Sequence, residues 1–247
     1  FISPKRNTRR WTKKISTLNK LIDTHEERII GVLKTLEDRI RSDLTSKTKG
    51  GSTFNTQFAI AYRPNIKTLI QGIYLKEADA IISEYDEIVK EYQKVVKKLP
   101  ISQKFKLLQK QDLETINQLK YLAFSGFQDI ANTFLDTISN EIYQSALIGK
   151  PFNEIVKNIA GQINGVYQRS SETQINRLVD FIEKNRYSSS KVIIDRVNQA
   201  KSTLASRYGA DILGNNMRKY AGQIAHDSIM QFDGQFTKYK ADQIGWG

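Results

Sequence analysis

Residues 15–36 read ISTLNKLIDTHEERIIGVLKTL, and the spacing of their apolar side chains decides the fold class. The two seam positions of this stretch are filled by Ile15, Ile22, Ile29 and Leu36 and by Leu18, His25 and Val32. This heptad pattern predicts a long helix, from about Ser16 to about Ser46, that packs along a neighbouring helix. The pattern leaves open whether that neighbour lies in the same chain or in a second copy, as in a self-associating coiled coil.

Helical periodicity continues through the rest of the chain. Apolar residues at three- and four-residue steps predict further helices over 65–99, 102–147, 153–163, 171–186 and 192–204. Residues 57–62 alternate instead, which predicts a short extended piece that Pro64 ends. Glycine- and proline-bearing tracts at 47–52 and 149–151 are expected to stop helices. The sequence therefore predicts an all-α fold, an elongated bundle of long antiparallel helices with little or no sheet.

The composition is that of a globular chain. Hydrophobic residues make up 39% of the 247 residues and charged residues 26%. The absence of cysteine excludes a disulfide framework and a thiolate metal site. No apolar run approaches the length of a membrane span, so no membrane segment is predicted. Because the first residue is phenylalanine, we expect the numbering to begin inside a longer or processed protein.

Half of the net charge of +12 falls in residues 1–14, which contain no acidic residue. The candidate DNA-binding residues of this basic arm are Lys5, Arg6, Arg9, Arg10, Trp11, Lys13 and Lys14. Cationic side chains around one stacking ring suit a phosphate backbone that is bound without reading its sequence. Six phosphate contacts would give a log–log salt slope of roughly −5. The alternatives are a solvated basic terminus or an arm that docks on an acidic protein.

Catalytic and metal-binding motifs are missing from the sequence. His25 and Glu26 begin an HExxH pattern, but Ile29 occupies the position of its second histidine. The one other histidine, His226, precedes Asp227, and adjacent side chains diverge by about 100° on a helix, so no orienting dyad is expected. No phosphate-binding loop, nucleophile elbow or EF-hand loop occurs. We therefore expect no enzyme activity, no metal and no cofactor.

Residues 215–247, NNMRKYAGQIAHDSIMQFDGQFTKYKADQIGWG, form the most distinctive part of the sequence. Their apolar residues recur at helical steps, and Gly234 is expected to mark a kink, a close contact or a helix end. The candidate protein-docking residues of this tail are Ile224, His226, Asp227, Phe232, Phe236, Tyr239 and Trp246. With this tail included, we divide the chain into a basic arm (1–14), a long-helix region (15–149) and a region of shorter helices (150–247).

Three parts of this tail carry a resemblance: IAHD at 224–227, DG at 233–234, and KADQIG at 240–245 followed by a tryptophan. Together they resemble the core signature of the phage head morphogenesis family, the minor head proteins typified by the F protein of Mu-like phages. The chain departs from that signature in three ways. His226 stands where the family usually has arginine, Gly245 follows Ile244 instead of preceding it, and the sequence ends before the family's next segment.

The resemblance implies a non-enzymatic structural virion protein, inside the head or at the portal vertex and in the host cytoplasm during assembly. It implies contacts with the portal protein and other head proteins, several copies per particle, and a role in head assembly and in packaging or delivering viral double-stranded DNA. The tail would be the protein-docking face. The alternative is a free-standing helical nucleic-acid-binding protein that acts through the basic arm, although no helix-turn-helix spacing supports it.

Overall fold

All regular structure in the described part of the chain is helical. The computed structural model describes residues 4–164, 173–185, 190–208 and 216–245, and these ranges contain no strand. The elements are α1 (Pro4–Lys47), η1 (Lys49–Gly51), α2 (Thr56–Leu69), the π-helix η2 (Ile70–Leu75), α3 (Lys76–Ser83), α4 (Asp86–Val96), α5 (Gln103–Lys106), α6 (Lys110–Leu147), α7 (Phe152–Asn164), α8 (Thr173–Asn185), α9 (Lys191–Tyr208) and α10 (Met217–Gln243). The predicted all-α class is confirmed. Within the described ranges, no helix has the length and apolar character needed to cross a membrane.

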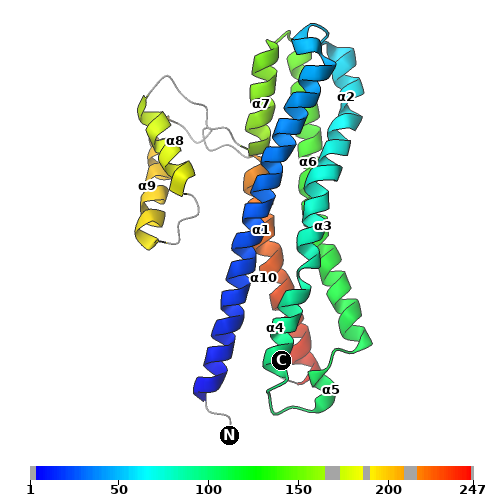
Figure 1. The fold of residues 1–247 in the computed structure, drawn as a ribbon, viewed down its shortest axis with the longest axis vertical. Coiled ribbons are helices and arrows are strands. Elements are labelled where there is room, and N and C mark those ends of the chain that lie inside the picture. The colour runs from blue at the N-terminus through cyan, green and yellow to red at the C-terminus, as the bar shows by residue number, and fades with distance from the viewer. Residues whose placement is uncertain (1–3, 165–172, 186–189, 209–215, 246–247) are drawn as a thin grey trace.

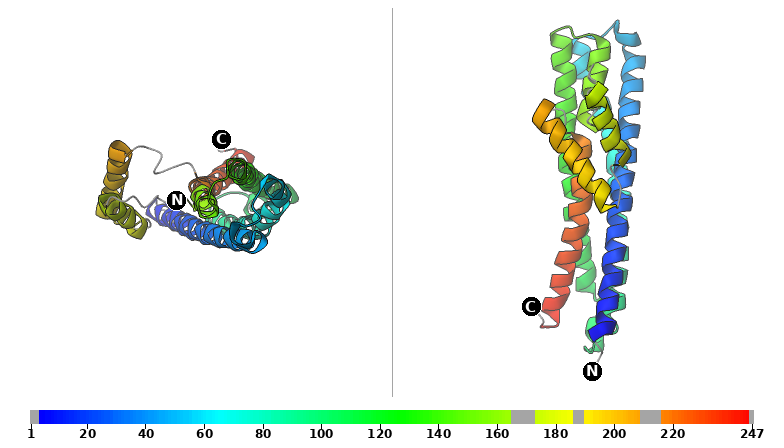
Figure 2. Two further views of the ribbon diagram at one scale, coloured as in Figure 1. Left: turned by 90° about the horizontal axis from the view of Figure 1, so that it is seen from above. Right: turned by 90° about the vertical axis from the view of Figure 1, so that its left-hand side faces the viewer.

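The main body is an elongated bundle of four antiparallel columns (Figure 1). The first column is α1, the second runs through α2, η2, α3 and α4, and the third is α6. The fourth is built from α7 and α10, which follow one another along the bundle and both pack against α1 and α6 (Figures 1 and 2). The long first helix therefore finds its partners within the same chain.

The pair α8 and α9 interrupts the fourth column in sequence. These two helices pack against each other around a small cluster of Ile182, Val197 and Ala200 that is separate from the main core. Figure 1 shows the pair beside the bundle. The boundary expected at residue 150 is not a boundary of the main core, because α7 and α10 contribute buried side chains to it.

The buried side of α1 repeats every eleven residues rather than every seven. Its buried positions follow steps of four, four and three and are Lys14, Leu18, Ile22, His25, Ile29, Leu33, Leu36, Ile40 and Leu44. The heptad prediction is wrong at Ile15, which is 54% exposed, and at Val32, which is only partly buried. Eleven residues make three turns at 3.67 residues per turn, close to the 3.6 of a straight α-helix. The stripe therefore stays on one face without a left-handed supercoil.

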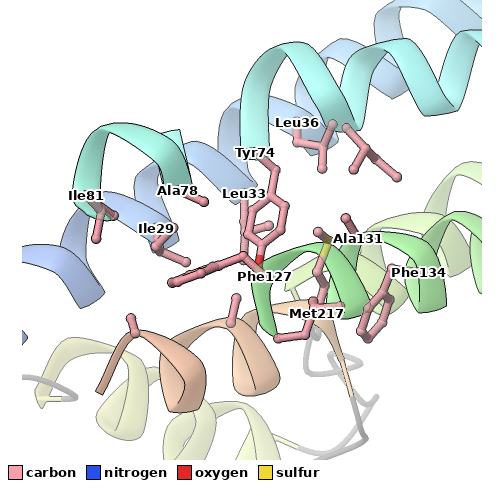
Figure 3. Packing of buried hydrophobic residues seen from close by; sticks show 14 of the residues in the cluster. Ile29, Leu33, Leu36, Tyr74, Ala78, Ile81, Phe127, Ala131, Phe134 and Met217 are labelled. Atoms are coloured by element: carbon pink, nitrogen blue, oxygen red, sulfur yellow. The ribbon is translucent and has the colours of Figure 1, made fainter. Parts of the chain in front are cut away.

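The middle of the bundle is an apolar layer to which all four columns contribute. Figure 3 shows Phe127 of α6 beside Ile29 and Leu33 of α1 and Tyr74 of η2, with Met217 of α10 in the same layer. The rings of Phe127 and Tyr74 lie 6.2 Å apart between centroids. Burial of these side chains is what holds the columns together, since each large apolar residue contributes roughly 1.5–3 kcal/mol.

The start of the second column differs from the prediction. Residues 57–62 are helical, because the side chain of Asn55 accepts a hydrogen bond from the N–H of Phe58 and caps α2 there. Pro64 lies inside this helix and does not end the segment. The carbonyl that Pro64 leaves without a donor belongs to Ile60, which is 65% exposed, so water can satisfy it.

Two expected helices are also shorter than predicted. The second column breaks at Glu84 and Tyr85, between α3 and α4. The third column begins at Lys110, where Gln109 and Asp112 form a capping box, and not near Ser102. The expected stop at 149–151 is confirmed, since α6 ends at Leu147 and Gly149 has a φ of +68°. No helix ends at Gly234, and no atom lies within 4 Å of where its Cβ would be.

Candidate functional site

The basic segment at the N-terminus is the start of α1 and not a separate arm. The helical backbone begins at Pro4, earlier than predicted. The side chains of Lys5, Arg6, Arg9, Arg10, Trp11 and Lys13 lie outside the described residues. Each residue turns the helix by 100°, so positions 5, 6, 9, 10 and 13 fall within an arc of about 140° around the helix axis. The buried positions 14, 18 and 22 are centred about 150° away from the middle of this arc. The helix therefore places the basic positions on its outer face.

Lys14 is the exception among the basic candidates. Its side chain is 4% exposed, ion-pairs with Asp233 of α10 and donates a hydrogen bond to Thr237 over 3.2 Å. The ammonium also lies 5.6 Å from the ring centre of Tyr92 in α4. The prediction that Lys14 contacts DNA is wrong, because position 14 belongs to the eleven-residue buried stripe. Lys14 instead joins α1 to α10.

The aromatic tail residues face inward. Phe232 and Phe236 are buried in the main core, and the ring of Phe236 packs edge-on against Tyr92 with 5.3 Å between centroids. Tyr239 is partly buried against the same core. The predicted docking face is therefore wrong at Phe232 and Phe236, whose apolar surface is already covered by α1, α4 and α6.

The remaining tail candidates lie in three different settings. Ile224 of α10 is half-buried against α6, and its Cδ1 lies 3.3 Å from the position that a Cβ on Gly126 would take. His226 is exposed and Asp227 is half-buried, and the imidazole Nδ1 lies 2.9 Å from the Asp227 carboxylate. The expectation that these neighbours could not pair is wrong, since side-chain torsions close the gap between them. Trp246 lies outside the described residues.

His25 forms the centre of a polar cluster where the second column breaks. Its Nε2 lies 3.0 Å from the carboxylate of Glu84, and its ring stacks on Tyr85 with 6.1 Å between centroids. Because a carboxylate only accepts, Nε2 carries the proton and Nδ1 is left buried without a partner. Arg28 binds both Glu84 and Glu77, the latter over 2.6 Å.

Burial sets the protonation state of this cluster. Burial lowers the pKa of His25, and the hydrogen bond that its ring donates to Glu84 opposes this without reversing it. Burial alone would raise the pKa of Glu84, but hydrogen bonds from Arg28 and His25 outweigh it and lower the pKa. At neutral pH the cluster therefore pairs a neutral imidazole with an ionised carboxylate.

The imidazole at the centre of the cluster is closed to solvent, whereas Glu84 and Arg28 are partly exposed. His25 is fully buried on the inward face of α1, as the heptad pattern predicted. Among the described residues, no group of three or more histidine, cysteine or acidic side chains could hold a metal ion. An open apolar depression on α6, lined by Asn117, Gln118, Tyr121 and Leu122, carries no titratable acid–base pair. The contacts of His25 and Arg28 with Glu84 and Glu77 join α1 to the second column.

Two further buried polar contacts tie α10 to the bundle, and sequence reasoning missed both. Lys240 donates to Asp112 over 2.9 Å, with side chains 4% and 0% exposed, and Gln243 donates to the same carboxylate. Ser228 shares a 2.6 Å hydrogen bond with Tyr85. Periodicity offered one signal: Lys240 falls four residues after Phe236 on the buried stripe of α10. A lysine at such a position requires a buried acidic partner.

Comparison with known proteins found no matching family model, no curated protein and no solved structure. The proposals below therefore depend on the residues and geometry of this chain and on the resemblance in its tail.

Proposed function

We propose that this protein is a non-enzymatic structural component of a phage virion, inside the head or at the portal vertex, that binds viral double-stranded DNA through the first turns of α1. The observation that carries the DNA contact is the position of the basic residues. Five of them occupy the outer arc of a helix that begins at Pro4, in a segment without acidic residues. A cationic helix face with no acid nearby attracts phosphate independently of base sequence.

The tail resemblance supports the placement in a virion. Of the described tail candidates, His226 is exposed and Asp227, half-buried, keeps a side chain that is 44% exposed, so these two are the positions proposed for docking on the portal protein or another head protein. The four-column bundle offers an elongated surface, and no cluster in its described part could hold a metal ion, which favours a scaffold over a metalloenzyme.

The DNA contact is tested by replacing Lys5, Arg6, Arg9, Arg10 and Lys13 with glutamine in the full chain. For a 30-bp duplex, we expect the slope of log binding constant against log salt concentration to become shallower by about 4 to 5. We expect the affinity at 0.1 M salt to fall by at least about 100-fold. Fluorescence anisotropy across a series of salt concentrations measures both. Lys14 is kept, because its partner is Asp233. An unchanged slope would refute the DNA contact.

Particle composition separates the virion role from the alternative of a free-standing nucleic-acid-binding protein. We expect quantitative mass spectrometry of purified phage particles to find this chain in several copies beside the portal protein. Particles that contain portal protein and lack this chain would reject the virion role and leave the nucleic-acid-binding alternative.

A further inference from the structure

The net charge of the protein is contained in two acid-free segments. Residues 1–14 hold six basic residues, and residues 92–111 hold six lysines, at positions 94, 97, 98, 104, 106 and 110. Neither segment contains an aspartate or glutamate. The other 26 of the 38 basic residues equal the 26 acidic residues in number, so the rest of the chain has no net charge.

The fold brings these two segments to the same end of the bundle. Lys14 of α1 lies against the ring of Tyr92 in α4, which fixes the two helices at one level. Because the columns are antiparallel, residues before 14 and residues after 92 continue in the same direction (Figures 1 and 2). At 1.5 Å per residue, residue 5 lies about 14 Å beyond that level and residue 96 about 6 Å.

The acidic residues beside the second segment are already paired. Glu91 forms an ion pair with Lys94, and Glu114 lies 3.9 Å from Lys110. Asp112 is buried against Lys240. Their negative charge is therefore compensated locally and does not offset the other lysines of the segment.

Four lysines at the turn between α4 and α6 remain available, and we call them the lysine cap: Lys97, Lys98, Lys104 and Lys106. The first three are exposed and the fourth is half-buried. None of the four forms an ion pair with another described residue. Four solvated ammonium groups on one turn, next to the basic start of α1, create a positive potential at this end.

The apolar residues of the same turn favour a polyphosphate over a membrane as partner. Leu99, Ile101 and Leu108 pack against the main core. The Lys104 ammonium lies over the ring of Phe105, 4.8 Å from its centre, and Leu107 is the exposed large apolar residue of the turn. Anchoring in a bilayer requires a buried apolar face, whereas a phosphate backbone requires only cations.

We propose that the lysine cap and the first turns of α1 form one composite surface for the phosphate backbone of double-stranded DNA. The proposal depends on the DNA contact proposed above and extends it to a second segment about ninety residues away in sequence. The two parts come from different columns, so they can contact phosphates at separate points along a duplex. Neutralising either part leaves the other in place.

The test replaces Lys97, Lys98, Lys104 and Lys106 together with glutamine in the full chain. The matched control replaces four exposed lysines elsewhere on the bundle, Lys34, Lys49, Lys67 and Lys76, and so removes the same charge. Anisotropy with a 30-bp duplex of arbitrary sequence is measured from 50 to 300 mM NaCl. We expect the cap variant to lose about 3 units of salt slope, and the control less than about 1.

The outcomes separate this inference from the function on which it depends. The composite surface is refuted if the cap variant and the control have equal salt slopes while the variant with glutamine at positions 5, 6, 9, 10 and 13 binds DNA weakly. The α1 contact then stands. If the wild-type chain does not bind the duplex, both fail. Vesicles with about 30% phosphatidylserine serve as a second probe. Cap-dependent vesicle binding without a cap effect on DNA would assign the lysine cap to a membrane and overturn the proposal.

Discussion

Replacing Asp112 with alanine is expected to lower the free energy of unfolding by about 3–5 kcal/mol. The substitution leaves the ammonium of Lys240 buried without its counter-ion and removes the acceptor for Gln243. It also removes the carboxylate that accepts from the N–H of Gln109 at the start of α6. Urea denaturation followed by circular dichroism at 222 nm measures the loss.

The control removes both charges at once. In the double variant Asp112→Leu with Lys240→Met, the site becomes apolar, and replacing a buried pair in this way is often neutral or stabilising. We therefore expect the double variant to be more stable than Asp112→Ala. A loss below about 1 kcal/mol for Asp112→Ala would mean that Lys240 reaches water or sheds its proton, which contradicts the buried pair.

The same pair makes stability depend on pH. Burial would raise the pKa of Asp112, but the Gln109 N–H and the Lys240 ammonium lower it below its ordinary value. A carboxyl with a lowered pKa in the folded state contributes stability above its unfolded pKa, about 4, and loses it as pH falls through the folded pKa. The double variant should show a weaker dependence on pH in that acidic range.

The sequence predicted the helices well because their signals are local. Apolar steps of three and four residues placed most of the helices, and the positive φ of Gly149 explains the stop after α6. Local signals failed where tertiary contacts decide. Pro64 fits inside α2 because Ile60, whose carbonyl it leaves without a donor, is an exposed residue, which no propensity reveals. The seam of α1 was assigned a seven-residue period because both periods share several positions, and only the neighbouring columns select eleven.

The candidate site was predicted less well, for a physical reason. A lysine or phenylalanine in sequence shows its chemistry but not which side of the helix is covered. Lys14 was grouped with the basic segment by its charge, although its register places it on the buried stripe. The sequence alone does not reveal the lysine cap as part of a larger surface, because its nearness to the start of α1 depends on the antiparallel packing of α1 and α4.

The packing of Phe236 yields the second large prediction. Phe236 is fully buried between Tyr92 and its helix neighbours Phe232 and Tyr239. Truncation to alanine removes most of a large ring from a rigid site and leaves a cavity, so we expect a loss of about 3–5 kcal/mol in the free energy of unfolding. The matched control on the same helix is Met230→Ala, because Met230 is 48% exposed and its loss should stay within about 0.5 kcal/mol.

This comparison decides between a core and a docking face in α10. If the Phe236 ring belongs to the hydrophobic core, Phe236→Ala lowers the urea midpoint of the isolated chain, and Met230→Ala leaves that midpoint almost unchanged. If the ring were a docking residue, the isolated Phe236→Ala chain would unfold like wild type, and the defect would appear only when the partner is added. Stability measured without any partner therefore tests the inward orientation of the tail aromatics, on which the reassignment of docking to His226 and Asp227 depends.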